Sequence, residues 1–261
     1  MNKILFYGGG NIAQAIISGL LSAGFNKKLI SFVDRNDSNR SKLSELGIKE
    51  RNLKDKIDLI ILCVKPKDIS LALKEISSGF NNPKVLSLVA GVSSRKYLTA
   101  VHNIKLIRGM PNTSSEFRMG ITALLNINAS KKLYKDTKTL FKLVGITLDL
   151  KSENQINDFT GLIGSGPAYF FYILKSYEKL LLKMADGDES LVKSIMANLM
   201  NGVGESVKGK ESLDELISAV ASKKGTTEAG INSMKSEKIT VSFNRSLKAA
   251  MKRAKEIADE S

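Results

Sequence analysis

The sequence has one cysteine, one histidine and no tryptophan among its 261 residues, and these scarcities exclude several kinds of protein. A lone cysteine, Cys63, excludes the internal disulfide framework that stabilises many small secreted domains. Cys63 and His102 together supply too few ligands for a zinc site of usual composition, so no metal is expected. These features predict a reducing, cytoplasmic setting.

Long apolar runs are also missing, because no stretch of 18 apolar residues occurs in the chain. Residues 1–3 lead directly into a short apolar run without the pattern of a secretory signal, so no membrane partner is expected. Hydrophobic residues nevertheless make up 43% of the sequence, which excludes wholesale disorder and provides for one or two cores.

The formal net charge of +14 is unevenly distributed. Residues 1–151 contain 25 basic and 11 acidic residues, whereas residues 152–261 contain 15 of each kind. The first part therefore carries the whole excess, which favours an anionic partner such as a phosphate-rich cofactor or a nucleic acid. The lysines are scattered, without interleaved aromatic residues or a recognised binding motif, so the cofactor is preferred and no nucleic acid is expected.

Residues 1–151 alternate short apolar runs with helix-like stretches, the rhythm of βαβ units. Continuous apolar runs are typical of strands whose two faces are both covered by helices. We therefore predict an α/β domain with a doubly wound, parallel sheet over residues 1–151. The predicted strands are Ile4–Tyr7, Leu29–Val33, Ile57–Val64, Val85–Val89, Ile104–Ile107, Ile121–Leu125 and Ile146–Leu150.

From residue 152 onward, apolar residues recur every three or four positions, which is the helical period. We predict an all-α C-terminal domain over residues 152–261, with helices near 170–184, 191–203, 212–221 and 242–261. The apolar stripe of the helix near 170–184 is pronounced enough to require cover, either from a large core or from a dimer partner.

A glycine-rich turn follows the first predicted strand and satisfies the pattern G-x-G-x-x-A; it reads Gly8-Gly9-Gly10-Asn11-Ile12-Ala13. Gly8 permits a tight turn, Gly10 lets the backbone approach a pyrophosphate, and Ala13 allows close packing of helix on strand. The start of the following helix supplies amide donors and a partial positive charge. This turn predicts a dinucleotide site of the Rossmann type.

Asp34 and Arg35 follow the second predicted strand, where such folds contact the adenosine ribose. An aspartate there accepts hydrogen bonds from the 2′-hydroxyl of NAD, whereas an arginine binds the 2′-phosphate of NADP. The basic excess favours NADPH and leaves NADH possible. The strand ends near Val64 and Val89 face the same crevice; Cys63 is interpreted as a small buried side chain and His102 as a surface residue.

Three further segments have an unusual composition: Val64-Lys65-Pro66, Arg108–Thr113 and Gly164–Tyr169. They resemble the V-K-P, R-x-M-P-N-T and G-S-G-P-A-Y segments of the pyrroline-5-carboxylate reductase family. The segment Ser222-Lys223-Lys224-Gly225-Thr226-Thr227 is similar to S-P-G-G-T-T, with lysines replacing the proline and the first glycine. A turn with positive φ at position 224 would be strained by lysine, although two cations there would help recruit a carboxylate substrate.

The resemblance implies an NADP-dependent oxidoreductase acting on CH–NH bonds, which reduces 1-pyrroline-5-carboxylate to L-proline in the final step of proline biosynthesis. Hydride transfer to a cyclic imine requires alignment and a hydrogen-bond donor, but neither a nucleophile nor a metal. The resemblance also implies a homodimer or a ring of dimers. The implied cofactor-binding residues are Gly8, Gly9, Gly10, Asn11, Ile12, Ala13, Asp34, Arg35, Val64, Lys65, Pro66, Ala90, Gly91 and Asn112.

For the substrate, the resemblance implies contacts from Glu153, Ser222, Gly225, Thr226 and Thr227, with the Thr227 hydroxyl at the ring nitrogen as the catalytic donor. Three alternatives stay open. A related imine or β-hydroxyacid reductase would use a lysine such as Lys175 on the first long helix of the second part. A nicotinamide-binding module without activity, or a nucleic-acid-binding protein, would also account for part of the pattern.

Overall fold

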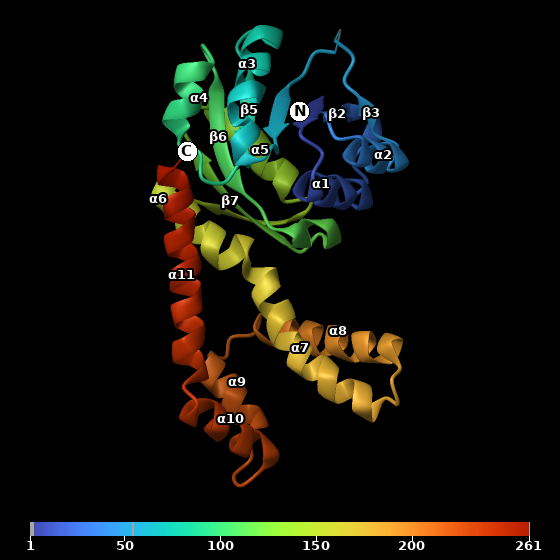
Figure 1. The fold of residues 1–261 in the computed structure, drawn as a ribbon, viewed down its shortest axis with the longest axis vertical. Helices are drawn as coiled ribbons and strands as arrows, with labels where there is room; N and C mark the ends of the chain where they lie inside the picture. Colours follow the sequence, from blue (N-terminus) through green and yellow to red (C-terminus); the bar gives the residue numbers. More distant parts are fainter. Residues whose placement is uncertain (1–2, 54, 261) are drawn as a thin grey trace. The chain divides into compact units, whose positions relative to one another are not determined.

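The computed structural model describes residues 3–53 and 55–260 and divides the chain into two compact units (Figure 1). The α/β unit comprises Met1–Pro167 and Ala249–Ser261, and the helical unit comprises Ala168–Lys248. The sequence predicted a division after residue 151. In the single chain, residues 152–167 and the C-terminal residues pack with the α/β unit.

The α/β unit contains an eight-stranded sheet in the order β3-β2-β1-β4-β5-β6-β7-β8. The strands are β1 (Ile4–Tyr7), β2 (Ile30–Val33), β3 (Lys49–Glu50), β4 (Leu59–Leu62), β5 (Lys84–Ser87), β6 (Lys105–Met110), β7 (Gly120–Asn126) and β8 (Gly145–Asp149). The predicted α/β class and the seven predicted strands are confirmed. The chain starts at a central strand and then extends the sheet on both sides, which creates a crevice at the carboxyl ends of β1 and β4.

All neighbouring strands are parallel except β6 and β7, which run antiparallel. This pair departs from the predicted parallel sheet. The reason is the length of the connection: a 3-10 turn over Thr113–Phe117 joins the two strands, and a parallel crossover needs a dozen residues or more. The return strand β7 then pairs in parallel with β8 at the edge of the sheet.

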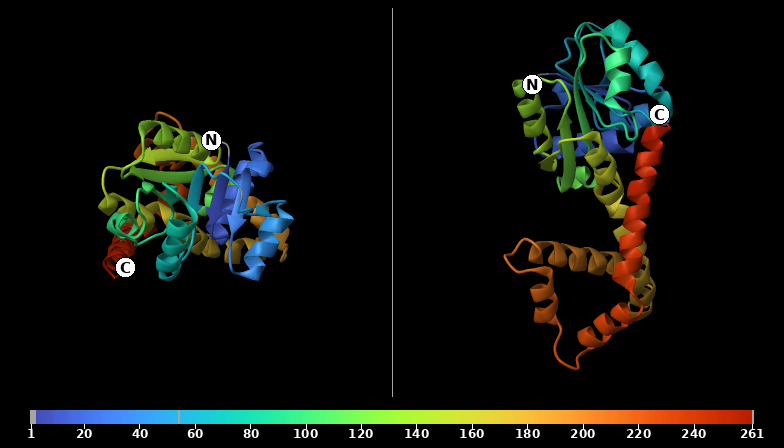
Figure 2. Two further views of the ribbon diagram at one scale, coloured as in Figure 1. Left: turned by 90° about the horizontal axis from the view of Figure 1, so that it is seen from above. Right: turned by 90° about the vertical axis from the view of Figure 1, so that its left-hand side faces the viewer.

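Helices cover both faces of the sheet, because successive side chains of a strand point to opposite faces. Ile4 and Phe6 of β1 belong to a core cluster with residues of α1, α2 and α5, whereas Leu5 belongs to a second cluster with residues of α3 and α4. Figure 2 shows the unit from two further directions. These helices are α1 (Asn11–Ser22), α2 (Asp37–Glu45), α3 (Ile69–Gly79), α4 (Ser94–Ala100) and α5 (Lys131–Phe141).

A third cluster joins the short helix α6 (Glu153–Phe159) to the sheet, through Ile156 and Phe159 packed with Met110 of β6. The end of α11 (Ile239–Asp259) reaches the same region. A side chain at Gly161 would place its Cβ 2.6 Å from the backbone nitrogen of Met251, so only glycine permits this close approach.

The helical unit contains most of α7 (Gly166–Met184), all of α8 (Glu189–Ser206), α9 (Leu213–Val220) and α10 (Thr226–Ser236), and the first part of α11. The predicted helices near 170–184, 191–203 and 212–221 are confirmed. The side chain of Ser212 accepts from the amide of Glu215 and forms a capping box that starts α9. Figure 2 shows α8, α9 and α10 as an open arrangement rather than a closed bundle, and Val192 is the one buried residue of this unit.

Candidate active site

The glycine-rich turn lies between β1 and α1, at the crevice, and its geometry explains its composition. Gly8 has a φ of 99°, and a Cβ there would lie 2.8 Å from the carbonyl carbon of Cys63. A Cβ at Gly10, in contrast, would meet no heavy atom of the described residues within 4 Å. The turn is therefore closed toward β4 at Gly8 and open at Gly10, next to the helix start whose first amides have no acceptor within α1, as a pyrophosphate site requires.

Asp34 connects this turn to the end of β2. Its Oδ2 accepts a hydrogen bond from the Gly9 amide at 2.5 Å, and its Oδ1 accepts from the Asn36 amide at 2.6 Å. The side-chain amide of Asn39 donates to Oδ2 at 3.2 Å. The carboxylate thus fixes the glycine turn as well as lying beside the ribose position predicted for it.

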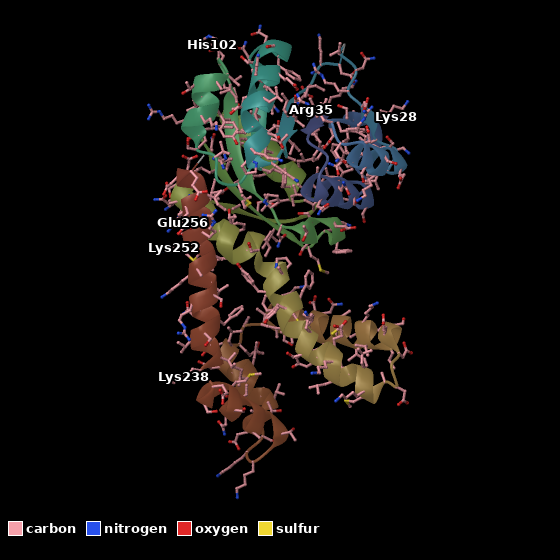
Figure 3. The ribbon with its side chains drawn as sticks, in the orientation of Figure 1. Lys28, Arg35, His102, Lys238, Lys252 and Glu256 are labelled. Atoms are coloured by element: carbon pink, nitrogen blue, oxygen red, sulfur yellow. The ribbon has the colours of Figure 1, made fainter. Side chains whose placement is uncertain are left out.

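Arg35, labelled in Figure 3, forms an ion pair with Glu75 of α3. The Tyr7 hydroxyl donates a hydrogen bond to the other carboxylate oxygen of Glu75. Both partners of the ion pair are substantially exposed, so the pair is easily exchanged for other ligands. A single carboxylate therefore holds Arg35 at the mouth of the crevice.

These residues surround a cavity of about 340 Å³. Six predicted cofactor residues line it: Gly8, Gly10, Asp34, Arg35, Val64 and Lys65. The lining also includes side chains that the sequence did not single out, namely Asn36, Asn39, Lys67 and Leu71 among others. Asn36 and Lys67 lie within three residues of predicted strand ends, and this position is the signal that would have found them, whereas Asn39 lies in α2 and carried no such signal.

Gly9, Asn11, Ile12 and Ala13 belong to the same turn and to the first residues of α1. Ala13 is fully buried against the sheet, as close packing requires, and Pro66 opens a short 3-10 turn after β4. None of these four predicted residues, nor Pro66, lines the cavity.

Ala90, Gly91 and Asn112 lie farther along the sheet, beyond β5 and β6. Gly91 has a φ of 66°, and a Cβ there would lie 2.4 Å from Cγ2 of Ile257. The Asn112 side chain accepts a hydrogen bond from the Ile121 amide at 3.0 Å, which ties the end of β6 to β7. The structure therefore divides the predicted cofactor residues between the ends of β1, β2 and β4 and the segments that follow β5 and β6.

Glu153 is the first residue of α6 and also has partners in α4 and β6, close to the loop that follows β5. Its Oε1 accepts hydrogen bonds from the Ser94 amide at 2.7 Å and from Nη1 of Arg108 at 3.1 Å. Both contacts use the same oxygen. Glu153 belongs to the α/β unit, whereas the other predicted substrate residues belong to the helical unit.

Ser222, Gly225, Thr226 and Thr227 come together in the turn that starts α10. The Gly225 amide donates to the Ser222 carbonyl at 2.9 Å, and a Cβ at Gly225 would lie 2.3 Å from the Ser222 hydroxyl. Thr226 and Thr227 are the first helical residues, so their amides have no acceptor within the helix. The turn presents hydroxyl and amide donors in a small space.

The expected strain at position 224 is confirmed, because Lys224 has a φ of 60°. Its amide donates a hydrogen bond to the carboxylate of Glu228 at 2.6 Å. Glu228 thus stabilises the left-handed residue from within the first turn of α10.

The remaining reactive groups do not alter this arrangement. Burial raises the pKa of the Cys63 thiol, which disfavours the thiolate. His102 is exposed after α4, as predicted (Figure 3). Within residues 3–53 and 55–260, no group of three His, Cys, Asp or Glu side chains is placed to hold a metal ion. No helix in the described part of the chain is long and apolar enough to cross a membrane.

Comparison with known proteins gives consistent results over the whole chain. The family model described as pyrroline-5-carboxylate reductase dimerisation matches residues 153–257, and the model described as NADP oxidoreductase, coenzyme F420-dependent, matches residues 3–91. Pyrroline-5-carboxylate reductase 1 of Bacillus spizizenii is 33% identical over 99% of this chain and 90% of its own length. The chain belongs to the pyrroline-5-carboxylate reductase family.

Other members of the pyrroline-5-carboxylate reductase family agree. The enzyme of Haemophilus influenzae is 30% identical over 97% of both chains. The solved structure of a pyrroline-5-carboxylate reductase from Coxiella burnetii has a TM-score of 0.83 and 27% identity, and covers 98% of both chains. The family resemblance inferred from four short segments is therefore confirmed.

Two charged residues of this family member escaped sequence reasoning. Glu75 is 40 residues from Arg35, and Arg108 is 45 residues from Glu153, so no local spacing connects either pair. Arg108 was noticed as part of the R-x-M-P-N-T resemblance, without a role. Contacts of this kind depend on strand order, which the sequence pattern alone does not specify.

Proposed function

We propose that this chain reduces 1-pyrroline-5-carboxylate to L-proline with NADPH, the final step of proline biosynthesis, a branch of amino-acid biosynthesis. The observation that carries the proposal is the presence, in one chain, of a dinucleotide crevice and of the Ser222–Thr227 turn with its threonine and amide donors. The names of the full-length relatives support the same reaction.

In the proposed mechanism, the open turn at Gly10 and the first amides of α1 bind the pyrophosphate, and Val64, Lys65 and the Ala90–Gly91 loop border the rest of the dinucleotide. A reduced nicotinamide supplies the hydride. The chain's own task is to align the cyclic imine with it and to exclude competing orientations.

The turn before α10 carries the proposed substrate contacts. The amides of Gly225, Thr226 and Thr227 bind the substrate carboxylate, since the helix start offers donors and partial positive charge. The Thr227 hydroxyl donates to the ring nitrogen, which makes the C=N carbon a better hydride acceptor. Ser222 and Glu153 complete the proposed contacts.

The choice of cofactor follows from Arg35 and Glu75. We propose that the 2′-phosphate of NADPH displaces Glu75 as the partner of Arg35, because a phosphate offers the guanidinium two charge-assisted hydrogen bonds. Arg35→Ala is then expected to weaken NADPH binding roughly 10- to 100-fold and NADH binding little. Glu75→Gln, the matched control, removes the competing charge and is expected to tighten NADPH binding. Equal effects of Arg35→Ala on both cofactors would contradict this assignment.

For assembly, we propose that residues 152–261 form the substrate-binding and dimerisation domain of a cytoplasmic homodimer, which can associate further into a ring of dimers. The family model that matches residues 153–257 is described by dimerisation, and the helical unit leaves its apolar side chains exposed in the single chain. In the proposed dimer, helices of the partner subunit bury these apolar side chains.

The decisive experiment is NADPH oxidation with 1-pyrroline-5-carboxylate by the wild-type chain and by Thr227→Ala. We expect turnover to fall about 100-fold or more while NADPH affinity stays unchanged, because one transition-state donor is removed. Thr227→Ser should restore most of the rate, and Thr139→Ala, an exposed threonine of α5, should match the wild type. Unchanged kinetics in Thr227→Ala would exclude this hydroxyl as the donor, and a wild type that binds NADPH without turnover would favour a binding module.

A further inference from the structure

Arg108 of β6 is a buried cation that the proposed mechanism does not use. Its residue exposure is 3%, and it lies on a strand covered on both faces. A guanidinium out of water is costly unless hydrogen bonds and an opposite charge compensate it. Its partners therefore show what the surrounding structure gains from a charge at this position.

The two NH2 groups of Arg108 bind the backbone of the loop that follows β5. Nη2 donates to the Val89 carbonyl at 2.9 Å, and Nη1 donates to the Val92 carbonyl. The Nε atom is buried and has no hydrogen-bond partner among residues 3–53 and 55–260. The hydrogen bonds of this guanidinium are thus directed toward the loop Val89–Val92 and toward Glu153.

Glu153 fixes the guanidinium from the other side. Its Oε1 is 3.1 Å from Nη1 of Arg108 and also accepts from the Ser94 amide at the start of α4. The carboxylate therefore joins α6, β6 and the start of α4, two residues beyond the loop. The ion pair is half-buried, since the Glu153 side chain retains 36% exposure, so it is screened less than a surface pair.

Tyr97 supports the same loop from within the core. Its ring centroid is 5.5 Å from the Arg108 guanidinium carbon, and its hydroxyl pairs with the Ser87 hydroxyl at 2.6 Å. The Ser87 hydroxyl in turn accepts from the Val89 amide at 3.3 Å. With Gly91 held in a left-handed conformation against Ile257, the backbone of the loop is fixed at both ends and in the middle.

The place of the loop in the sheet indicates what this rigidity serves. In a sheet of this order, the adenosine half of a dinucleotide lies over β2, and the other half extends over β4 and β5. We propose that Arg108 is a positioning residue for the nicotinamide half of the cofactor, acting through the carbonyls of Val89 and Val92, with Glu153 holding its guanidinium. This inference rests on the proposed function, because it takes a nicotinamide dinucleotide as the ligand.

Arginine is required because one planar group must reach two carbonyls and a carboxylate at once. Arg108→Lys keeps the charge but supplies a single ammonium. The matched control is Arg118→Lys, which also alters a guanidinium that donates to a backbone carbonyl, that of Leu143 at 3.2 Å, but at an exposed position. Glu153→Gln tests whether Glu153 holds the Arg108 guanidinium, because it keeps an acceptor for the Ser94 amide and removes the negative charge.

The test compares two ligands with the whole protein. Arg108→Lys is expected to weaken NADPH binding about tenfold and to lower turnover roughly 10- to 100-fold, because the nicotinamide is misplaced. Binding of adenosine 2′,5′-bisphosphate, which carries only the adenosine half, should be unchanged. Glu153→Gln should show the same contrast more weakly, and Arg118→Lys should show none. A loss of affinity for both ligands in equal measure would reduce Arg108 to a general structural role and overturn the proposal.

Hydrogen exchange without ligand provides the second measurement. In Arg108→Lys, the amides of residues 90–92 are expected to exchange at least about tenfold faster, while those of residues 8–13 keep their rates. If Arg108→Lys changed the exchange rates of residues 90–92 and of residues 8–13 by the same factor, the proposal would be overturned even if activity fell. If the wild type binds NADPH without reducing 1-pyrroline-5-carboxylate, the proposed function fails, and the ligand contrast and the exchange rates still decide the role of Arg108.

Discussion

The two units of this chain treat their apolar side chains in opposite ways. The α/β unit buries them in three clusters around the sheet, and many strand residues have no exposed surface at all. In the helical unit, Val192 is the one buried residue, whereas Tyr172 of α7 is 76% exposed and Val220 of α9 is 70% exposed. Both units carry amphipathic helices, but only the first contains the surface that covers them.

This difference shows where the information for each unit's stability lies. A helix of the α/β unit finds its apolar partner in a strand of the same chain, so the fold is specified locally in space. The helices α8 and α9 begin at side-chain caps, yet many large apolar side chains of α7 to α10 stay exposed in one chain. Exposed apolar surface of this kind is typical of an interface, and in the proposed assembly a partner subunit supplies the burial that the helical unit lacks in one chain.

The largest expected effect is therefore a charge placed on an apolar stripe of the helical unit. Ile195 lies on the stripe of α8 that also contains Leu191 and Leu199. Ile195→Glu is expected to dissociate the proposed dimer, because each protomer loses about 2–3 kcal/mol of apolar burial and a twofold interface counts that loss twice. Light scattering after size-exclusion chromatography measures the oligomeric state. Lys193→Glu on the same helix is the control. A dimeric Ile195→Glu protein would contradict the assignment of this stripe to the subunit interface.

The difference in burial between the two units also explains which of their elements the sequence predicted. The strands were predictable because runs such as Leu59–Leu62 are apolar on both faces, whereas β3 was missed because Lys49 and Glu50 are polar and exposed. The antiparallel direction of β7 was not predicted, because it follows from the short connection after β6 and not from the apolar pattern of the strand. The glycine turn and the turn at residue 224 were predictable, since both are local backbone requirements.

The charged contacts of the site were not predictable in the same way. Glu75 and Arg108 meet partners that strand order brings together across 40 and 45 residues of sequence. In the helical unit, the helix period predicted where helices form but not what covers them, because that depends on a second surface. Local rules therefore identify the elements, and tertiary or quaternary contacts decide which of their residues act together.

A second, smaller effect is a difference between the two units in how their stability depends on protein concentration. Leu73→Ala in α3 removes a fully buried side chain and is expected to cost about 2–5 kcal/mol of unfolding free energy at any protein concentration. Leu180→Ala in α7 should instead lower stability by an amount that changes with protein concentration, because its cover comes from association. Urea unfolding at several protein concentrations measures both. A concentration-independent loss in Leu180→Ala would indicate that the helical unit is covered from within its own chain.

The smallest expected effect concerns the turn before α10, where a local strain persists in the unit with the least burial. Lys224 adopts a φ of 60°, while its neighbour Lys223 does not have a positive φ. Lys224→Gly is expected to stabilise the protein by about 1 kcal/mol, because glycine reaches the left-handed region without the steric cost that a Cβ brings. Lys223→Gly, the control, should be neutral or slightly destabilising, since it only adds freedom to the unfolded chain. If Lys224→Gly destabilises as much as Lys223→Gly, the lysine side chain contributes interactions that offset its strain, and recruitment of the substrate carboxylate, read as a change in KM, becomes the property to measure.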